Sequence, residues 1–185
     1  GLRHAFLMAY GALPKAQRGG QRVLPLREQS LETLRRLSRG DLPRTVDFAR
    51  DLVRLGSCDE ALERLREAEE LIDHPGERLA FASVEASCDA YEAAVARIEG
   101  VIEAEAEPAP ALEEWRGDLL AMAGNAFRAK QAYQNALETT RGRSAQLLAK
   151  LGDQLVELGE YDDALQKYAQ ATQLDEGYRY PHARA

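Results

Sequence analysis

The sequence has 185 residues, 45% of them hydrophobic, and a formal net charge of −7 at pH 7. This length suits one ordinary domain or one short repeat array, and no run of about 18 apolar residues is present that could span a membrane. An acidic chain disfavours nucleic acid as a partner, because phosphate contacts need a basic surface. We expect a soluble chain with no membrane insertion, with the cytoplasm slightly favoured and the compartment otherwise open.

Residues 1–40 form a basic head. They hold eight Lys or Arg against two Glu, a net charge of +6, whereas residues 41–185 carry −13. Apolar residues recur at helical spacing from Leu2 to Leu13 and from Leu26 to Leu37, with a Gly-rich loop at residues 18–22 between them. This pattern predicts an irregular basic helical hairpin or N-terminal cap; the alternative is the tail of an upstream domain.

Four segments of the remaining chain share one spacing. Each has a turn residue, an Ala five positions later, a large apolar residue four further on, and a small or branched apolar residue three after that. A small Ala lets two helices approach closely, and a Gly after a helix tolerates the left-handed conformation that ends it. Each segment therefore predicts a tight helix–turn–helix unit. The four positions are occupied by Gly56, Asp89, Gly124 and Gly159; Ala61, Ala94, Ala129 and Ala164; Leu65, Ile98, Tyr133 and Tyr168; Ala68, Val101, Ala136 and Ala171.

The turn residues lie 33, 35 and 35 positions apart, and this period resembles that of the tetratricopeptide repeat (TPR) family. The last unit, LLAKLGDQLVELGEYDDALQKYAQATQLD, resembles the family most closely, although Glu176 stands where the family has a closing Pro. The resemblance implies an all-α, right-handed superhelical array of antiparallel helix pairs, a TPR-like solenoid. It covers residues 41–176 as repeats at about 42–74, 75–108, 109–143 and 144–176, followed by a short tail at 177–185.

In the TPR family the first helices of successive repeats line a concave groove that holds a peptide. The resemblance therefore implies a protein–protein interaction module: a scaffold, an adaptor or an assembly factor. We expect the groove to be basic at its N-terminal end, lined by small residues in the middle and acidic at its C-terminal end. The expected groove residues are Arg50, Arg54, Leu79, Ser83, Glu114, Trp115, Asp118, Met122, Lys150, Asp153 and Glu157, with Val46, Val53, Ala86, Ser87 and Val156 on the same faces.

The acidic end of this groove suits a partner segment that carries Lys or Arg beside an apolar anchor. Trp115 and Met122 lie about two helical turns apart and are expected to receive that anchor. The alternative is that Trp115 is an ordinary core residue. Because the groove offers acids in place of a Lys/Asn cradle, we do not expect it to bind a partner's C-terminal carboxylates.

The sequence carries no pattern typical of catalysis. The three histidines, His4, His74 and His182, lie in separate regions, and neither a zinc spacing, a nucleophile–base set nor a phosphate-binding loop is present. We therefore predict no enzyme activity, no catalytic residue, no metal and no cofactor. Cys58 and Cys88 form no C-x-x-C pair and are predicted to be buried, unpaired thiols.

Two further functions stay open beside the interaction module. One is a regulatory or interaction arm excised from a larger multidomain enzyme. The other is a self-assembling structural repeat array, or a homodimer, because the last hairpin leaves apolar groups such as Leu165 and Tyr168 without a following helix to cover them.

Overall fold

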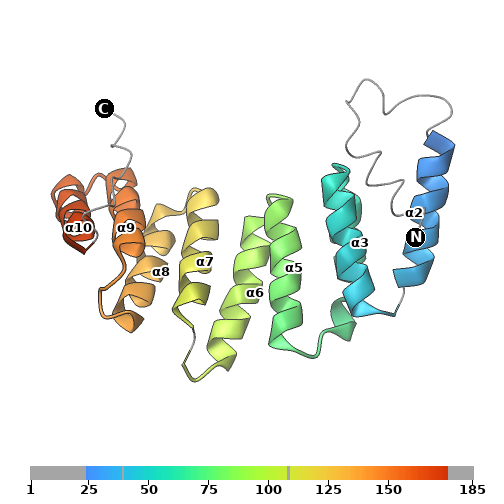
Figure 1. Cartoon of the computed structure of the whole chain (residues 1–185), viewed down its shortest axis with the longest axis horizontal. Helices are drawn as coiled ribbons and strands as arrows, with labels where there is room; N and C mark the ends of the chain where they lie inside the picture. The colour runs from blue at the N-terminus through green and yellow to red at the C-terminus, as the bar shows by residue number, and fades with distance from the viewer. Residues whose placement is uncertain (1–23, 39, 108, 175–185) are drawn as a thin grey trace. The chain divides into compact units, whose positions relative to one another are not determined.

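The computed structural model describes residues 24–38, 40–107 and 109–174 (Figure 1). These ranges hold α-helices and one short 3-10 helix and no strand, so the predicted all-α fold is confirmed. None of these helices is both long enough and apolar enough to cross a membrane. The helix expected from Leu2 to Leu13 and the tail at 177–185 lie outside the described residues.

The helices follow one another as short antiparallel pairs with brief connections. Several begin at a capping side chain: Asp41, Asn125 and Ser144 each accept a hydrogen bond from the backbone N–H three residues on. The elements are α2 (Leu24–Ser38), α3 (Leu42–Arg54), α4 (Cys58–Glu67), the 3-10 helix η2 (Glu69–Leu71), α5 (Pro75–Ser87), α6 (Tyr91–Ala104), α7 (Pro110–Met122), α8 (Ala126–Thr139), α9 (Ala145–Glu157) and α10 (Tyr161–Leu174).

All four predicted turn residues adopt the left-handed conformation. Their φ angles are +76° at Gly56, +58° at Asp89, +75° at Gly124 and +76° at Gly159. Each turn also has the hydrogen bond that typically closes such a helix end, as from the backbone N–H of Ser57 to the carbonyl of residue 52, at 2.9 Å. Asp89 fills the role without being Gly, because a short polar side chain tolerates this conformation better than most.

The chain divides into two compact units, Gly1–Ala90 and Tyr91–Ala185, and the division falls inside the second repeat expected from the sequence. In the first unit, α3 packs against α2, α4 and α5. The small and large residues of the repeat pattern are buried there as predicted. They join an apolar core whose members include Phe48, Leu52, Ala61, Leu65, Phe81 and Val84.

In the second unit, α7 pairs with α8 and α9 pairs with α10, while α8 also packs against α9 and α6 against α7. The pairs are close because a Gly on each first helix faces a Tyr on the second. A Cβ added at Gly117 would lie 2.5 Å from the ring of Tyr133, and one at Gly152 would lie 2.5 Å from the ring of Tyr168. These contacts fix the orientation of α7 against α8 and of α9 against α10, and therefore which side chains of α7 and α9 face away from the paired helix.

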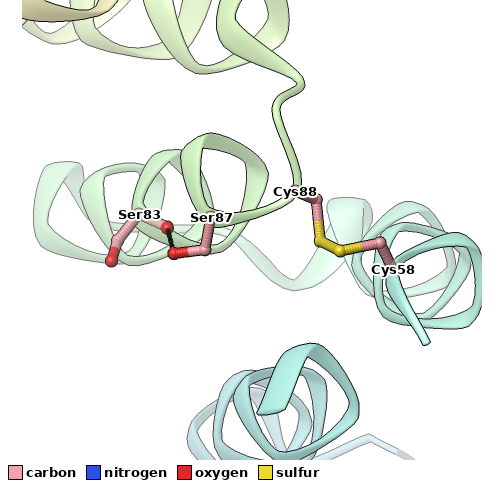
Figure 2. The surroundings of a disulfide bond; sticks show 4 residues. All are labelled: Cys58, Ser83, Ser87 and Cys88. Atoms are coloured by element: carbon pink, nitrogen blue, oxygen red, sulfur yellow. Dashed lines mark hydrogen bonds between the residues drawn. A yellow bond between two sulfur atoms is a disulfide. The ribbon is translucent and has the colours of Figure 1, made fainter. Parts of the chain in front are cut away.

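The two cysteines are not unpaired thiols, contrary to the sequence-based prediction. Cys58 and Cys88 are joined by a disulfide, with their Cα atoms 5.4 Å apart and a sequence separation of 30 (Figure 2). The reason lies in the repeat geometry. Each cysteine lies beside the turn between two helices, and stacking of α5 on α3 and α4 brings these two ends together.

Candidate functional site

The first unit contains a cleft between α3 and α5, which we call the α3–α5 cleft. Its volume is about 230 Å³. One wall comes from α3, where positions i, i+3 and i+4 share a helix face, and the other comes from successive turns of α5. The lining residues are Arg50, Val53 and Arg54 of α3 and Ser83, Val84 and Ser87 of α5.

The cleft is basic at its mouth and carries no acidic lining residue. The side chains of Arg50 and Arg54 are 45% and 62% exposed, and each forms one ion pair within α3: Arg50 Nη1 lies 3.5 Å from Asp47, and Arg54 Nη1 lies 3.2 Å from Asp51. A guanidinium has five N–H donors in a planar fork. Each arginine therefore has N–H donors left to bind an anion in the cleft while it keeps its ion pair with the neighbouring aspartate.

Hydroxyl groups line the opposite wall. The hydroxyl of Ser87 donates to the carbonyl of Ser83 at 2.8 Å, which fixes the position of its oxygen on α5 (Figure 2). The structure thus brings the predicted residues Arg50, Arg54 and Ser83 to one cleft. Leu79 is half-buried one turn earlier on α5 and is not part of the lining.

Val46 was expected on the same face as Arg50, but it is buried in the core of the first unit. The helix pattern alone placed it one turn before Arg50. Val46 shares the helix face of Arg50, but neighbouring helices cover that face at Val46, so the prediction that Val46 lines the groove was wrong. Val84 lines the cleft but was not predicted.

The second unit carries a polar network on α7 and α9, which we call the α7–α9 face. Lys150 Nζ on α9 lies 2.8 Å from Glu114 and 2.7 Å from Asp118 on α7. Gln146 donates to the same carboxylate of Glu114 at 3.0 Å. The single cation of the predicted acidic groove end is therefore held between two of its acids, and the two helices are joined by these bonds.

Two tyrosines of the second helices complete this face from beneath. Tyr133 donates its hydroxyl to Asp118, and Tyr168 donates to Asp153, both at 2.8 Å. Burial raises the pKa of Tyr133 well above its ordinary range, and the hydrogen bond and negative charge of Asp118 raise it further. The pKa of Tyr168 is raised by the same kinds of cause, burial and then Asp153. Both phenols therefore stay protonated and keep the carboxylates oriented.

Lys150 stays charged for a similar reason. Burial acts to lower its pKa, but the hydrogen bonds and negative charges of Asp118 and Glu114 raise it overall. The ammonium group also lies 5.9 Å from the centroid of the Tyr133 ring, within cation–π range. Lys150 therefore neutralises acidic groups of its own face, and we do not assign it to a ligand anion.

The predicted apolar anchor residues differ in exposure. Met122, at the end of α7, is 60% exposed, whereas Trp115 is half-buried. Glu157, at the end of α9, is exposed, and Asp153 is half-buried. Met122 and Glu157 are thus the most accessible of the predicted residues on this face.

Sequence reasoning named Tyr133 and Tyr168 as packing residues and missed their bonds to the acids. A signal was present: Gly-Asp recurs at residues 117–118 and 152–153, each followed by a Tyr 16 positions after the Gly. The disulfide also had a signal, since Cys58 and Cys88 both lie within two positions of a repeat turn residue. Within the described ranges, His, Cys, Asp and Glu residues form no group of three that could hold a metal ion.

Comparison with known proteins agrees with this helical architecture. A family model, the tetratricopeptide repeat-like domain, matches residues 49–151, more than half of the chain. No curated protein matches the sequence significantly.

Several solved structures are similar to the chain in fold. MamA of strain MSR-1 has 19% sequence identity and a TM-score of 0.63, with 95% of this chain and 98% of that chain covered. MamA from Desulfovibrio magneticus RS-1 has 17% identity and a TM-score of 0.62, covering 97% and 99% of the two chains. YrrB, a TPR protein with an unusual peptide-binding site, has 21% identity and a TM-score of 0.54, covering 80% and 76%.

Proposed function

The chain belongs to the tetratricopeptide repeat-like domain family, and from this premise we propose that it holds a partner polypeptide on the groove faces of its first helices. The fold supports a protein–protein interaction module, and the proposal assigns no catalytic step to the chain. The observation that carries the proposal is the α3–α5 cleft. Its lining includes Arg50, Arg54 and Ser83, three residues that the resemblance to the TPR family assigns to the groove face.

The chemistry of the α3–α5 cleft suits an acidic group of the partner next to a small apolar group. Two guanidinium groups one turn apart can each form a charge-assisted, bidentate hydrogen bond with a carboxylate. The existing pair between Arg50 and Asp47 is exposed, and such pairs contribute little free energy. A partner carboxylate can therefore compete for Arg50, while Val53 and Val84 offer apolar contact below it.

The α7–α9 face suits the opposite chemistry, a Lys or Arg beside an apolar anchor. Four acids, Glu114, Asp118, Asp153 and Glu157, face one cation, Lys150, which leaves a net charge of −3. Because Lys150 already binds Glu114 and Asp118, we assign the selectivity for a basic partner to Asp153 and Glu157. Met122 and Trp115 supply the apolar contact.

Two labelled peptides test the proposal by fluorescence anisotropy. The acidic probe is a ten-residue peptide that alternates Glu with Ala, and the basic probe is one that alternates Lys with Leu. Arg50→Gln with Arg54→Gln should weaken binding of the acidic probe about tenfold or more, since hydrogen bonds to charged groups contribute about 1.5–3 kcal/mol each. Trp115→Ala should weaken the basic probe about 30-fold if Trp115 is a hot spot, from a cost of about 2 kcal/mol.

Matched controls separate the two surfaces from general charge effects. Arg66→Gln changes one exposed cation on α4, and Glu138→Gln changes one exposed anion on α8; both residues lie on second helices. Both controls should leave the affinity for either probe nearly unchanged, because each removes a single exposed charge on a second helix. Both affinities should fall with added salt, because exposed charges are screened beyond about 8–10 Å. Equal losses in control and surface variants, or no binding of either probe, would overturn the proposal.

A second candidate function, self-association through the last hairpin, is favoured by one observation. Tyr161 and Leu165 on α10 lie one turn apart and are both more than 60% exposed. Exposed apolar groups on one helix face are typical of contact surfaces. Sedimentation at low and high salt tests this: a concentration-dependent dimer that Leu165→Lys abolishes supports it, and a monomer at tens of micromolar in both buffers contradicts it.

A further inference from the structure

The disulfide lies at the end of the α3–α5 cleft. Cys58 is the first residue of α4, four positions after Arg54. Cys88 caps the C-terminus of α5 and directly follows Ser87, which lines the cleft. Figure 2 shows the bond at the same end of α5 that carries Ser87 and, one turn earlier, Ser83. The disulfide therefore links the segment that follows α3, one wall of the cleft, to the segment that follows α5, the other wall.

Apolar packing and the disulfide hold different parts of α5. Phe81, in the middle of α5, and Val84, three residues before its end, are fully buried in the core of the first unit, so apolar contacts hold the helix as far as Val84. Its C-terminal end is held covalently at Cys88. Both cysteines are half-buried, and so the bond is within reach of a small thiol. Opening the bond should loosen the end of α5 while the helix stays packed at its centre.

We propose that the Cys58–Cys88 disulfide is thiol-sensitive and holds the walls of the α3–α5 cleft in place. Partner binding at the cleft therefore weakens when a dithiol reductant opens the bond. This inference rests on the proposed function of the cleft. Loosening the end of α5 moves Ser87 relative to the arginines of α3. A shift of this wall changes how an anionic group is seated against Arg50 and Arg54. Because hydrogen bonds weaken steeply when the donor angle falls below about 120°, this shift reduces the affinity for the anion.

The chemistry of the switch is thiol–disulfide exchange. A thiolate of the dithiol attacks one sulfur of the protein disulfide, the S–S bond breaks, and a mixed disulfide forms while the other cysteine leaves as a thiolate. The second thiol of the reductant then attacks the mixed disulfide and closes its own ring. Two electrons pass from the dithiol to the protein, and the two cysteines end as thiols once protonated.

Linkage makes the coupling reciprocal. If reduction lowers the affinity for a ligand by some factor, that ligand raises the resistance of the disulfide to reduction by the same factor. Typical couplings between two sites lie at about 5–150-fold. We expect the acidic Glu/Ala probe to bind the oxidised chain at least about fivefold more tightly than the reduced chain. A saturating probe should then lower the equilibrium constant for reduction of the bond by dithiothreitol by the same factor.

The experiment compares the chain before and after dithiothreitol, and the variant Cys58→Ala with Cys88→Ala, by anisotropy with both probes. The basic Lys/Leu probe is the internal control, because both cysteines of the sequence lie in the first unit. The expected result is weaker binding of the acidic probe alone, with unchanged helix content by circular dichroism. The variant should match the reduced chain in either buffer.

The possible failures are distinguishable. Equal binding of the acidic probe to oxidised and reduced chain overturns the redox coupling and leaves the proposed function standing. Loss of both probes on reduction, or loss of helix content, overturns the coupling by showing that the disulfide is a general staple of the fold. No binding of the acidic probe even to the oxidised chain overturns the binding role of the cleft, and the coupling with it.

Discussion

Replacing Gly117 by Ala tests the contact that sets the α7–α8 pair and thereby the position of the α7–α9 face. A Cβ at this position would lie 2.5, 2.7 and 3.0 Å from three atoms of the Tyr133 ring. The ring has little room to withdraw, because Tyr133 is buried and its hydroxyl is bonded to Asp118 at 2.8 Å. We therefore expect overpacking near the top of its usual range.

The magnitude follows from two opposing effects. Overpacking a well-packed core costs about 1–3 kcal/mol, here about 3. Ala is a better helix former than Gly by about 1 kcal/mol, which offsets part of that cost. The expected loss for Gly117→Ala is thus about 2 kcal/mol. The matched change Gly152→Ala should cost about zero, since its partner Tyr168 is less buried and its ring can move.

Urea denaturation followed by circular dichroism and by the fluorescence of Trp115, the chain's single Trp, measures both variants. Trp115 lies in α7, two positions before Gly117, and so reports on the same hairpin. In a Tyr133→Leu background the ring is gone, and Gly117→Ala should become neutral or stabilising. If Gly117→Ala destabilises both backgrounds equally, the ring contact is not the cause and the reasoning fails.

Three further outcomes are expected. Ala164 is buried at a helix crossing, so Ala164→Leu should destabilise by about 1–3 kcal/mol, and an unchanged melting midpoint would contradict this. Reducing the Cys58–Cys88 disulfide, which closes a loop of about 30 residues, should lower the free energy of unfolding by about 3–4 kcal/mol in chemical denaturation on the chain-entropy model; no change would contradict it. Because the pKa values of Tyr133 and Tyr168 are raised on folding, their contribution is complete below the ordinary pKa of 10.0 and is lost as pH rises above it. Denaturation between pH 8 and 11 should show this loss, and it should be smaller when both tyrosines are changed to Phe.

The repeat architecture was predictable because its signals are local. A residue in the left-handed conformation ends a helix wherever it occurs, and Gly56, Gly124 and Gly159 meet that need in any context. The Ala five positions later is buried in every repeat for the same local reason: it lies on the inner face of the second helix. Spacing therefore predicted the helices and the small residues between them.

The candidate site was predictable only in part. Helix periodicity places Arg50 and Arg54 on one face of α3, and packing of α5 against α3 adds Ser83 to the same cleft. The same periodicity misplaced Val46, because it does not say how far the neighbouring helix covers that face. The roles of these residues as ligand contacts stay predictions.

The sequence by itself determined the all-α class, the turn positions and the residues of each helix face, because these depend on contacts within a few residues. Only the tertiary structure decided which distant side chains meet. Lys150 forms an ion pair with Glu114, 36 positions away, and Cys58 forms a disulfide with Cys88, 30 positions away. Such pairs depend on how one helix pair stacks on the next. That stacking determines whether a charge faces solvent or a counter-charge, and whether a thiol is free or bonded.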